Sequence, residues 1–357
     1  MSDDRATAAW KALLASARRA GHDGGHYLAQ EQHGRTPAYL WPLSQVLHAS
    51  AIVGDVDTWQ LACTQLARYR RRGGAGLAHF PGARACYFDD NAWVGLAAAQ
   101  RVLDNDGGGD GGGDDGGGGP TEPDREAPAA VVDAAWRFCD RGRRTDGGVR
   151  WRDERRSPVN TCSTAPVAAL ALRAADAGVL DATTALDAAY RATIFLDERL
   201  RRDDGLFADH LDVDDRVDWG VFSYNQGVPA AVHVLLARHR GEGSPARERH
   251  LRRAHEIADA ALHEFAGDRL FTHPPAFNAI FFRNLLVLDA HSPRADVRPA
   301  LDAYLDRVWD EARDPSTGLF VAGGIGTYDG ASTIDQAALT QLYAVATWPR
   351  GRAERLC

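Results

Sequence analysis

Residues 182–201 read ATTALDAAYRATIFLDERLR, and residues 223–239 read SYNQGVPAAVHVLLARH. The first stretch has apolar side chains at helical spacing and a charged face that includes Asp187, Arg191 and Asp197. The second stretch is apolar on most sides and carries little charge. A helix with one charged face lies at a surface, whereas a helix that is apolar all round is buried. Together the two stretches predict an outer helix followed by an inner helix.

The same alternation runs through the rest of the chain, and strand patterns are nearly absent. The periodicity predicts helices over residues 4–20, 37–53, 56–71, 89–103, 126–141, 160–176, 182–201, 223–239, 246–265, 277–290, 296–312 and 332–347. Six helices with a charged face thus alternate with six apolar ones. This pattern predicts an all-α fold, the (α/α)6 barrel of six helical hairpins.

Residues 104–123 cannot contribute to a core. They read DNDGGGDGGGDDGGGGPTEP, and a run so rich in glycine loses much backbone entropy on ordering and buries no apolar area. We expect a disordered insertion that joins an inner helix to the next outer one. The helical pattern on both sides indicates a single domain over residues 1–357.

Composition restricts the class of protein. The 357 residues include 41 basic and 49 acidic side chains, a net charge of -8, which argues against a nucleic-acid partner. No run approaches the ~20 apolar residues that span a bilayer. The first residues lack a basic and then apolar export segment, so we expect a cytoplasmic location. The five cysteines form no CxxC pair, and no spacing suggests a metal site or a cofactor.

Each predicted inner helix begins with aromatic, amide, hydroxyl or acidic residues and then becomes apolar. These groups occupy residues 39–45, 87–93, 160–163, 224–227, 277–283 and 332–336. If the inner helices run parallel, their N-termini meet at one end of the barrel and line one cleft. Aromatic faces and polar groups in a cleft suit a carbohydrate. The alternative is that these residues are helix caps and buried core aromatics.

Asp89 and Asp90 are the most informative pair in these groups. Glycoside hydrolysis needs one carboxyl group that protonates the leaving oxygen and a second that acts as nucleophile or base. Repulsion between adjacent carboxylates raises one pKa, while the helix N-terminus favours ionisation of the other. The alternative is an acidic first turn without a catalytic role.

The run YFDDNAW at residues 87–93 resembles the signature of glycoside hydrolase family 76, the endo-α-1,6-mannanase family. Further similar segments follow in the family's order. They are GGVRW at 147–151 with Asn160 after it, DGL at 204–206, YNQG at 224–227, and the stretch from Phe277 to Arg283. The resemblance covers roughly residues 37–347.

The resemblance implies an (α/α)6 barrel and a retaining mechanism in which Asp89 is the nucleophile and Asp90 the general acid/base. Through the same resemblance, substrate would be bound by Trp93, Asn160, Tyr224, Asn225 and Arg283. The groups at the helix starts add Trp41, Tyr87, Asn91 and Gln226 to the candidate substrate-binding residues.

The expected substrate is a carbohydrate with α-mannosidic, and specifically α-1,6, linkages. Since no export segment is visible, we expect an intracellular oligosaccharide or glycolipid, with transglycosylation as a second outcome. One alternative is a sugar epimerase, but His48, His210 and His233 lie outside the six groups. The other is a catalytically silent glycan-binding protein, which loss of a carboxylate would have indicated. Both carboxylates are present.

Overall fold

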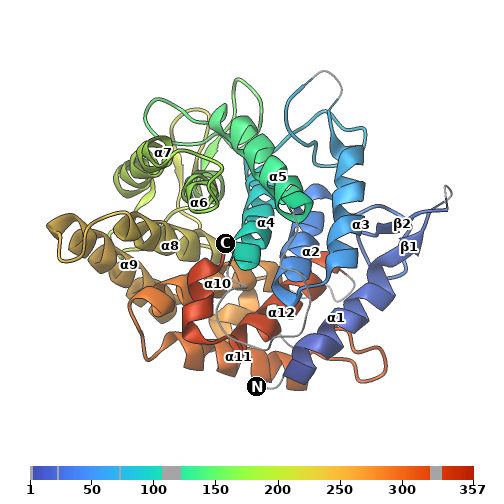
Figure 1. Cartoon of the computed structure of the whole chain (residues 1–357). Helices are drawn as coiled ribbons and strands as arrows, with labels where there is room; N and C mark the ends of the chain where they lie inside the picture. Colours follow the sequence, from blue (N-terminus) through green and yellow to red (C-terminus); the bar gives the residue numbers. More distant parts are fainter. Residues whose placement is uncertain (1–2, 22–23, 72–73, 107–121, 322–331) are drawn as a thin grey trace.

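Twelve α-helices form two concentric rings in the computed structural model, which describes residues 3–21, 24–71, 74–106, 122–321 and 332–357. The outer helices, which Figure 1 shows around the periphery, are α1 (Asp3–Ala17), α3 (Val56–Leu66), α5 (Glu122–Asp140), α7 (Ala182–Phe195), α9 (Pro245–Glu264) and α11 (Val297–Glu311). The inner helices are α2 (Leu40–Val53), α4 (Phe88–Asp106), α6 (Thr161–Asp176), α8 (Tyr224–Arg238), α10 (Pro275–His291) and α12 (Thr333–Ala346).

The inner ring is closed. Each inner helix packs against the next, from α2 through α4, α6, α8 and α10 to α12, and α12 packs against α2. Helices α8 and α10 are buried along almost their whole length. The outer helix α9, by contrast, buries only Ala254, Ile257, Ala258 and Ala261. The predicted (α/α)6 barrel is therefore confirmed, and the two kinds of helix lie where their apolar patterns placed them.

The helix limits follow the prediction within a few residues, with corrections at the first helix and at α7, which ends at Phe195 and continues as the π-helix η2 (Leu196–Leu200). Residues 18–20 were expected to be helical, but they form strand β1 (Arg18–Ala20), which pairs antiparallel with β2 (His26–Leu28). Next to this pair of strands, the Gly21 amide donates to the Gly25 carbonyl. Helix α3 also ends early, at Leu66, and continues as the short 3-10 helix η1 (Ala67–Tyr69).

The glycine-rich insertion starts and ends in helix. Residues 104–106 belong to α4 and residues 122–123 to α5, so these five positions are not part of a loop as expected. Residues 107–121, on which the prediction of disorder rests, lie outside the described residues.

A repeated pair of hydrogen bonds fixes the start of three inner helices. A side-chain amide near the helix start accepts from the backbone N–H, and donates to the carbonyl, of an apolar residue in the preceding loop, at 2.7–3.0 Å. Asn91 binds Leu77 in this way, Gln226 binds Phe207, and Gln336 binds Phe320. These bonds satisfy buried backbone groups that no helix or strand would pair. They also hold the loops that surround one end of the barrel.

A three-stranded antiparallel sheet lies at the same end. It consists of β3 (Val159–Asn160), β4 (His210–Leu211) and β5 (Val217–Asp218). The register places Asn160 opposite His210. The sheet therefore joins the start of α6 to the loop that precedes α8.

The other end of the barrel is covered by the 3-10 helix η4 (Arg350–Arg355) and the residues that follow it. Helix η4 packs against α10. Arg173 of α6 is fully buried and donates to the carbonyls of Glu354 and Leu356, while the Cys357 amide donates to Gln100 of α4. One end of the barrel is thus closed by backbone.

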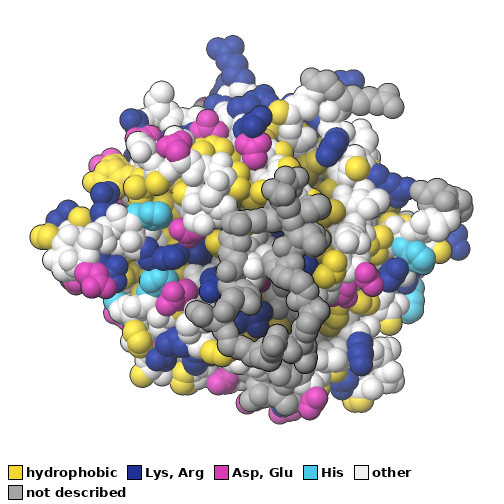
Figure 2. All heavy atoms as spheres, viewed as in Figure 1, with side chains coloured by type: hydrophobic (Ala, Val, Ile, Leu, Met, Phe, Trp, Pro, Cys, Tyr) yellow, Lys and Arg dark blue, Asp and Glu magenta, His cyan; other side chains and the backbone are white. Residues whose placement is uncertain are grey.

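Basic and acidic side chains are interspersed on the face seen in Figure 2. Many form short-range pairs along the outer helices. Arg137 pairs with Asp133 at 2.7 Å and Arg191 with Asp187 at 3.0 Å, each four residues apart. Exposed pairs of this kind contribute only about 0.3–0.5 kcal/mol each. The stability of the fold therefore comes from the apolar core between the rings.

Candidate active site

A cavity of about 690 Å³ opens at the end of the barrel where the inner helices begin. All six groups predicted from the helix starts contribute to its wall, which confirms that the inner helices run parallel. The lining residues from these groups are Tyr39, Trp41, Pro42, Tyr87, Asp89, Asp90, Trp93, Asn160, Cys162, Tyr224, Phe277, Ile280, Ser332 and Ile334. The connecting loops add Gln30, His79, Trp151, Pro158, Asp209 and His210.

Asp89 and Asp90 lie side by side in the first turn of α4, and both reach the cavity. The Asp89 carboxylate accepts three hydrogen bonds. Its Oδ1 accepts from the Asp90 backbone N–H at 3.0 Å, and its Oδ2 accepts from Trp151 Nε1 at 3.2 Å and from Cys162 Sγ at 3.5 Å. No described residue donates to the Asp90 carboxyl group. The two neighbouring carboxyl groups therefore differ in their surroundings.

This difference separates their protonation states. Burial raises the pKa of Asp89 to about 6, although the hydrogen bonds that it accepts oppose the rise. Burial also raises the pKa of Asp90 well above its usual range, and the charge of Asp89 raises it further. Near neutral pH the pair can therefore hold one negative charge, on Asp89, and one acidic proton, on Asp90.

A third carboxylate lines the cavity at Asp209, just before β4. Its Oδ2 lies 2.8 Å from Nδ1 of His210, and its Oδ1 accepts a hydrogen bond from Asn225 Nδ2 at 3.0 Å. Asp209 and His210 were not among the predicted site residues. The sequence analysis placed His210 outside the six groups at the helix starts, and His210 reaches the cavity from strand β4 instead.

The cavity wall is rich in aromatic rings. The Tyr87 and Trp151 rings lie 4.9 Å apart, and those of Tyr224 and Phe277 lie 4.1 Å apart. Two polar atoms of the wall have no hydrogen-bond partner within the described residues, namely Trp41 Nε1 and Asn160 Oδ1. A buried polar group without a partner is costly unless a ligand completes it. The wall therefore presents mainly aromatic faces, whereas these two polar atoms are buried beneath its surface.

Six of the predicted substrate-binding residues occupy or adjoin the cavity, and three do not. Trp41, Tyr87, Trp93, Asn160 and Tyr224 line it, and Asn225 lies behind the wall, where it holds Asp209. Asn91 and Gln226 bind backbone groups of the loops, as described above. Arg283 is fully buried and donates from Nη1 to Gln341 Oε1 at 2.6 Å. None of these three side chains lines the cavity, although Asn91 and Gln226 hold the loops that contribute to its wall.

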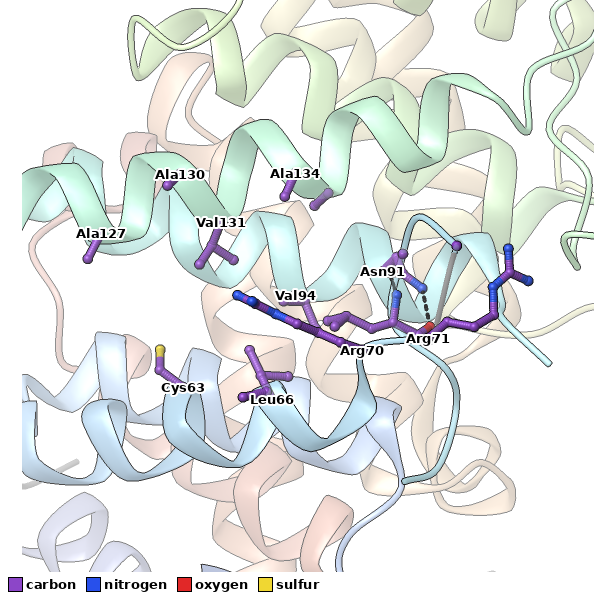
Figure 3. Close-up of a pocket in the computed structure, with 15 residues that line it drawn as sticks. Cys63, Leu66, Arg70, Arg71, Asn91, Val94, Ala127, Ala130, Val131 and Ala134 are labelled. Atoms are coloured by element: carbon purple, nitrogen blue, oxygen red, sulfur yellow. Dashed lines mark hydrogen bonds between the residues drawn. The ribbon is translucent and has the colours of Figure 1, made fainter. Parts of the chain in front are cut away.

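A second cavity, of about 450 Å³, lies on the outer side of α4 (Figure 3). Its walls are formed mainly by Leu66, Val94 and Val131 together with the alanines of α5, and Arg70 and Arg71 lie beside it. None of its described lining residues is a carboxylate. This second cavity therefore lacks the paired carboxyl groups that line the first one.

The family comparison assigns the fold and the reaction class. Residues 128–344 match the model of glycosyl hydrolase family 76. The chain belongs to this family. It is therefore a glycoside hydrolase, and the resemblance seen in the sequence is confirmed. The matched segment contains Trp151, Asn160, Asp209 and the YNQG run, whereas the Asp89–Asp90 pair precedes it.

Solved structures show the same fold over nearly the whole length of this family 76 enzyme. An α-mannanase of family 76 from Bacteroides thetaiotaomicron is 14% identical, with a TM-score of 0.79 over 99% of this chain and 96% of that chain. An inactive variant of an α-1,6-mannanase from Salegentibacter, in complex with α-1,6-mannotriose, is 16% identical, with a TM-score of 0.70 over 99% and 98%. A D-mannose isomerase is 12% identical, with a TM-score of 0.67 over 96% and 97%.

At these identities the likeness establishes the barrel and no more. A comparison with curated protein sequences found no match. Within the described residues, no helix is long and apolar enough to cross a membrane. The same residues contain no group of three or more His, Cys, Asp or Glu side chains placed to hold a metal ion.

Proposed function

We propose that this family 76 enzyme cleaves α-mannosidic linkages, specifically α-1,6 linkages, with retention of anomeric configuration. The observation that carries the proposal is the unequal pair at the cavity wall. Asp89 accepts three hydrogen bonds, whereas Asp90 accepts none from the described residues and has the more strongly raised pKa. A carboxylate beside a protonated carboxyl group is what a two-step glycosidase requires.

In the first step Asp90 would give its proton to the glycosidic oxygen while that oxygen leaves the anomeric carbon. The Asp89 carboxylate would attack the same carbon and form a glycosyl ester. In the second step Asp90, now a carboxylate, would take a proton from water as the water oxygen attacks the anomeric carbon and releases Asp89. A sugar hydroxyl can replace this water, which would give transglycosylation.

Recognition of the sugar would rest on the rest of the wall. The aromatic rings of the wall suit the apolar face of a pyranose ring. Asp209, held by Asn225, offers an acceptor. The α-1,6-mannosidic assignment is supported by the mannanases and the bound α-1,6-mannotriose among the structural neighbours. The intracellular oligosaccharide or glycolipid expected from the sequence stays a prediction.

The experiment uses α-1,6-linked manno-oligosaccharides with the wild-type protein and the variants Asp89→Asn and Asp90→Asn. We expect reducing-end products from the wild type and a loss of activity of at least about a thousandfold in either variant, as for other groups that act in the chemical step. Proton NMR during the reaction should show the α-anomer as the first product. A first product with the β-configuration, or full activity in both variants, would refute the proposal.

A second candidate function comes from the imidazoles at the cavity. His79 and His210 line it, and Asp209 orients His210. A histidine oriented in this way can act as the base that abstracts a proton in a sugar isomerase or epimerase. The test is incubation of free mannose with the protein in deuterated water. Deuterium incorporation next to the carbonyl carbon, without cleavage of the oligosaccharides, would favour this second function.

A further inference from the structure

The Cys162 thiol is part of the wall beside the proposed nucleophile. Cys162 is the second residue of α6, lines the cavity and is 8% exposed. Its Sγ lies 3.5 Å from Asp89 Oδ2, the oxygen that also accepts from Trp151 Nε1. Two donors from two different segments, α6 and the loop after α5, thus converge on one carboxylate oxygen.

We propose that Cys162 is a positioning residue for the glycosidase reaction, because its S–H group donates to Asp89 Oδ2 and fixes the rotation of that carboxylate. The inference rests on the proposed role of Asp89 as nucleophile. The Asp90 backbone N–H holds Oδ1, and the two donors on Oδ2 prevent rotation about the Cβ–Cγ bond. The carboxylate is thereby held in one orientation before the substrate arrives.

The weakness of the thiol as a donor suits this role. A carboxylate that attacks a carbon must give up part of its hydrogen bonding, and a strong donor would stabilise the free enzyme more than the transition state. An S–H group is a weak donor, so it orients Asp89 at little cost in nucleophilicity. A serine hydroxyl at this position would hold the carboxylate more tightly.

The thiol must stay protonated to donate, and its surroundings ensure this. Burial raises the pKa of Cys162 well above its usual range, and the charges of Asp89 and Asp209 raise it further, while the Tyr224 hydroxyl opposes the rise. The titratable groups that interact with the Asp89–Cys162 pair are Asp90 on α4, Cys139 on α5, Tyr224 on α8 and Asp209, whose partner is His210, at β4.

A matched control exists on the other side of α4. Cys139 of α5 is also a buried thiol, and its Sγ donates to the backbone carbonyl of Phe88 at 3.4 Å. It does not line the cavity. Cys139→Ala therefore removes a buried thiol and its hydrogen bond next to the catalytic turn without removing a donor to Asp89.

The test compares Cys162→Ala, Cys162→Ser and Cys139→Ala, with pH profiles of kcat/KM on an α-1,6-linked mannotriose and melting temperatures. In Cys162→Ala we expect kcat to fall about fivefold, with KM within twofold of wild type. We also expect the acidic limb of the profile to move up by about half a pH unit, since one hydrogen bond to the charged form is lost. In Cys162→Ser the acidic limb of the kcat/KM profile should lie at the wild-type pH or at a lower pH. In Cys139→Ala the acidic limb should lie at the wild-type pH.

The outcomes separate positioning from packing. Equal losses in the alanine and serine variants with an unmoved acidic limb would show that Cys162 only fills space, and would overturn the inference. A wild-type profile in Cys162→Ala would overturn it as well. If Asp89→Asn keeps its activity, the proposed function has failed at its nucleophile. That result is distinguishable from a failure confined to Cys162.

Discussion

Asn225 Nδ2 donates to Asp209 Oδ1 at 3.0 Å, so an amide buried in α8 holds a carboxylate at the cavity wall. Tyr224, the residue before it, lines the cavity itself. Gln226, the residue after it, binds the backbone of Phe207, two residues before Asp209. The YNQG run therefore serves the site largely through the loop that carries Asp209.

The first prediction concerns this amide. Asn225→Ala should lower kcat/KM for α-1,6-linked mannotriose by about tenfold, since loss of a hydrogen bond to a charged group costs about 1.5–3 kcal/mol and part of this should reappear in substrate binding. Asn284→Ala removes another buried amide, one that donates to the Ile280 carbonyl on α10, and is the control. Steady-state kinetics would contradict the prediction if both variants lost the same activity.

Gly227 of the same run has an architectural role. A Cβ atom at this position would lie 2.7 Å from the Phe281 carbonyl oxygen and 2.8 Å from Phe281 Cα, because α8 and α10 pack closely there. Gly227→Ala should therefore destabilise the protein by about 1–3 kcal/mol, the usual cost of overpacking. Gly241→Ala meets no atom within 4 Å and should be nearly neutral. Urea unfolding measures both, and equal midpoints would refute the prediction.

Asp90 should lower the free energy of unfolding at neutral pH. The pKa of Asp90 is raised in the folded protein, so the unfolded chain releases this proton at lower pH than the folded protein does. Stability therefore falls as pH rises from about 4 through the folded-state pKa. Asp90→Asn removes this term and should raise the free energy of unfolding at pH 7 by at least about 1 kcal/mol, while it abolishes activity.

The stability that Asp90→Asn gains over the wild type should shrink toward zero at pH 4. At this pH the unfolded wild-type chain also begins to bind a proton at Asp90. Thermal unfolding of wild type and variant at pH 4 and pH 7 gives the comparison. A variant that is less stable than wild type at pH 7 would show that Asp90 is held by interactions stronger than the cost of its burial.

Substitution of Asp289 should lower the free energy of unfolding, in contrast to Asp90→Asn. Its carboxylate is fully buried at the end of α10 and accepts from Arg298 Nε at 3.1 Å, Arg350 Nε at 3.0 Å and the Arg294 backbone N–H at 2.9 Å. It thus ties α10 to α11 and to η4. Asp289→Ala should cost about 1.5–3 kcal/mol, because charge-assisted hydrogen bonds are lost while both guanidinium groups stay partly exposed to water. Asp302→Ala, on the exposed side of α11, is the control in the same urea titration.

The sequence could predict the barrel because buried and exposed helices differ in pattern at every hairpin. It could also predict which helix starts meet at the cavity, since six parallel helices bring six N-termini together. It could not tell which side of each helix start faces inward. Asn91 follows Asp90 directly, and a step of one residue turns the side chain by about 100°, toward Leu77 instead of the cavity.

The sequence also could not predict how deep a side chain lies in the barrel or where the connecting segments run. Arg283 lies on the same side of α10 as the lining residue Ile280, but one turn deeper, where it meets Gln341 of α12. Asp209 and His79 come from connecting loops without periodicity, and His210 comes from the two-residue strand β4. Their positions depend on the amide pairs and on the β3–β4 pairing between distant segments.

The last prediction concerns acid stability and a histidine pair far from the Asp89–Asp90 pair in sequence. His233 of α8 and His250 of α9 lie with their Nδ1 atoms 3.0 Å apart, a hydrogen bond that needs at least one neutral ring. Burial, together with the charge of His250, lowers the pKa of His233 to about 3. The unfolded chain therefore binds this proton near pH 6.5, whereas the folded protein does not. Stability should fall as pH drops from about 6.5 toward 3.

His233 should contribute up to about 1.4 kcal/mol to the slope for each pH unit within that window. His233→Phe should reduce the slope by this contribution, while the buried His48, whose pKa is also lowered, continues to contribute. His26→Phe, at an exposed position of β2, should keep the wild-type slope. Urea unfolding at intervals between pH 4 and pH 7 measures all three proteins. If the slope is the same in wild type and His233→Phe, the acid sensitivity of the barrel arises from other groups.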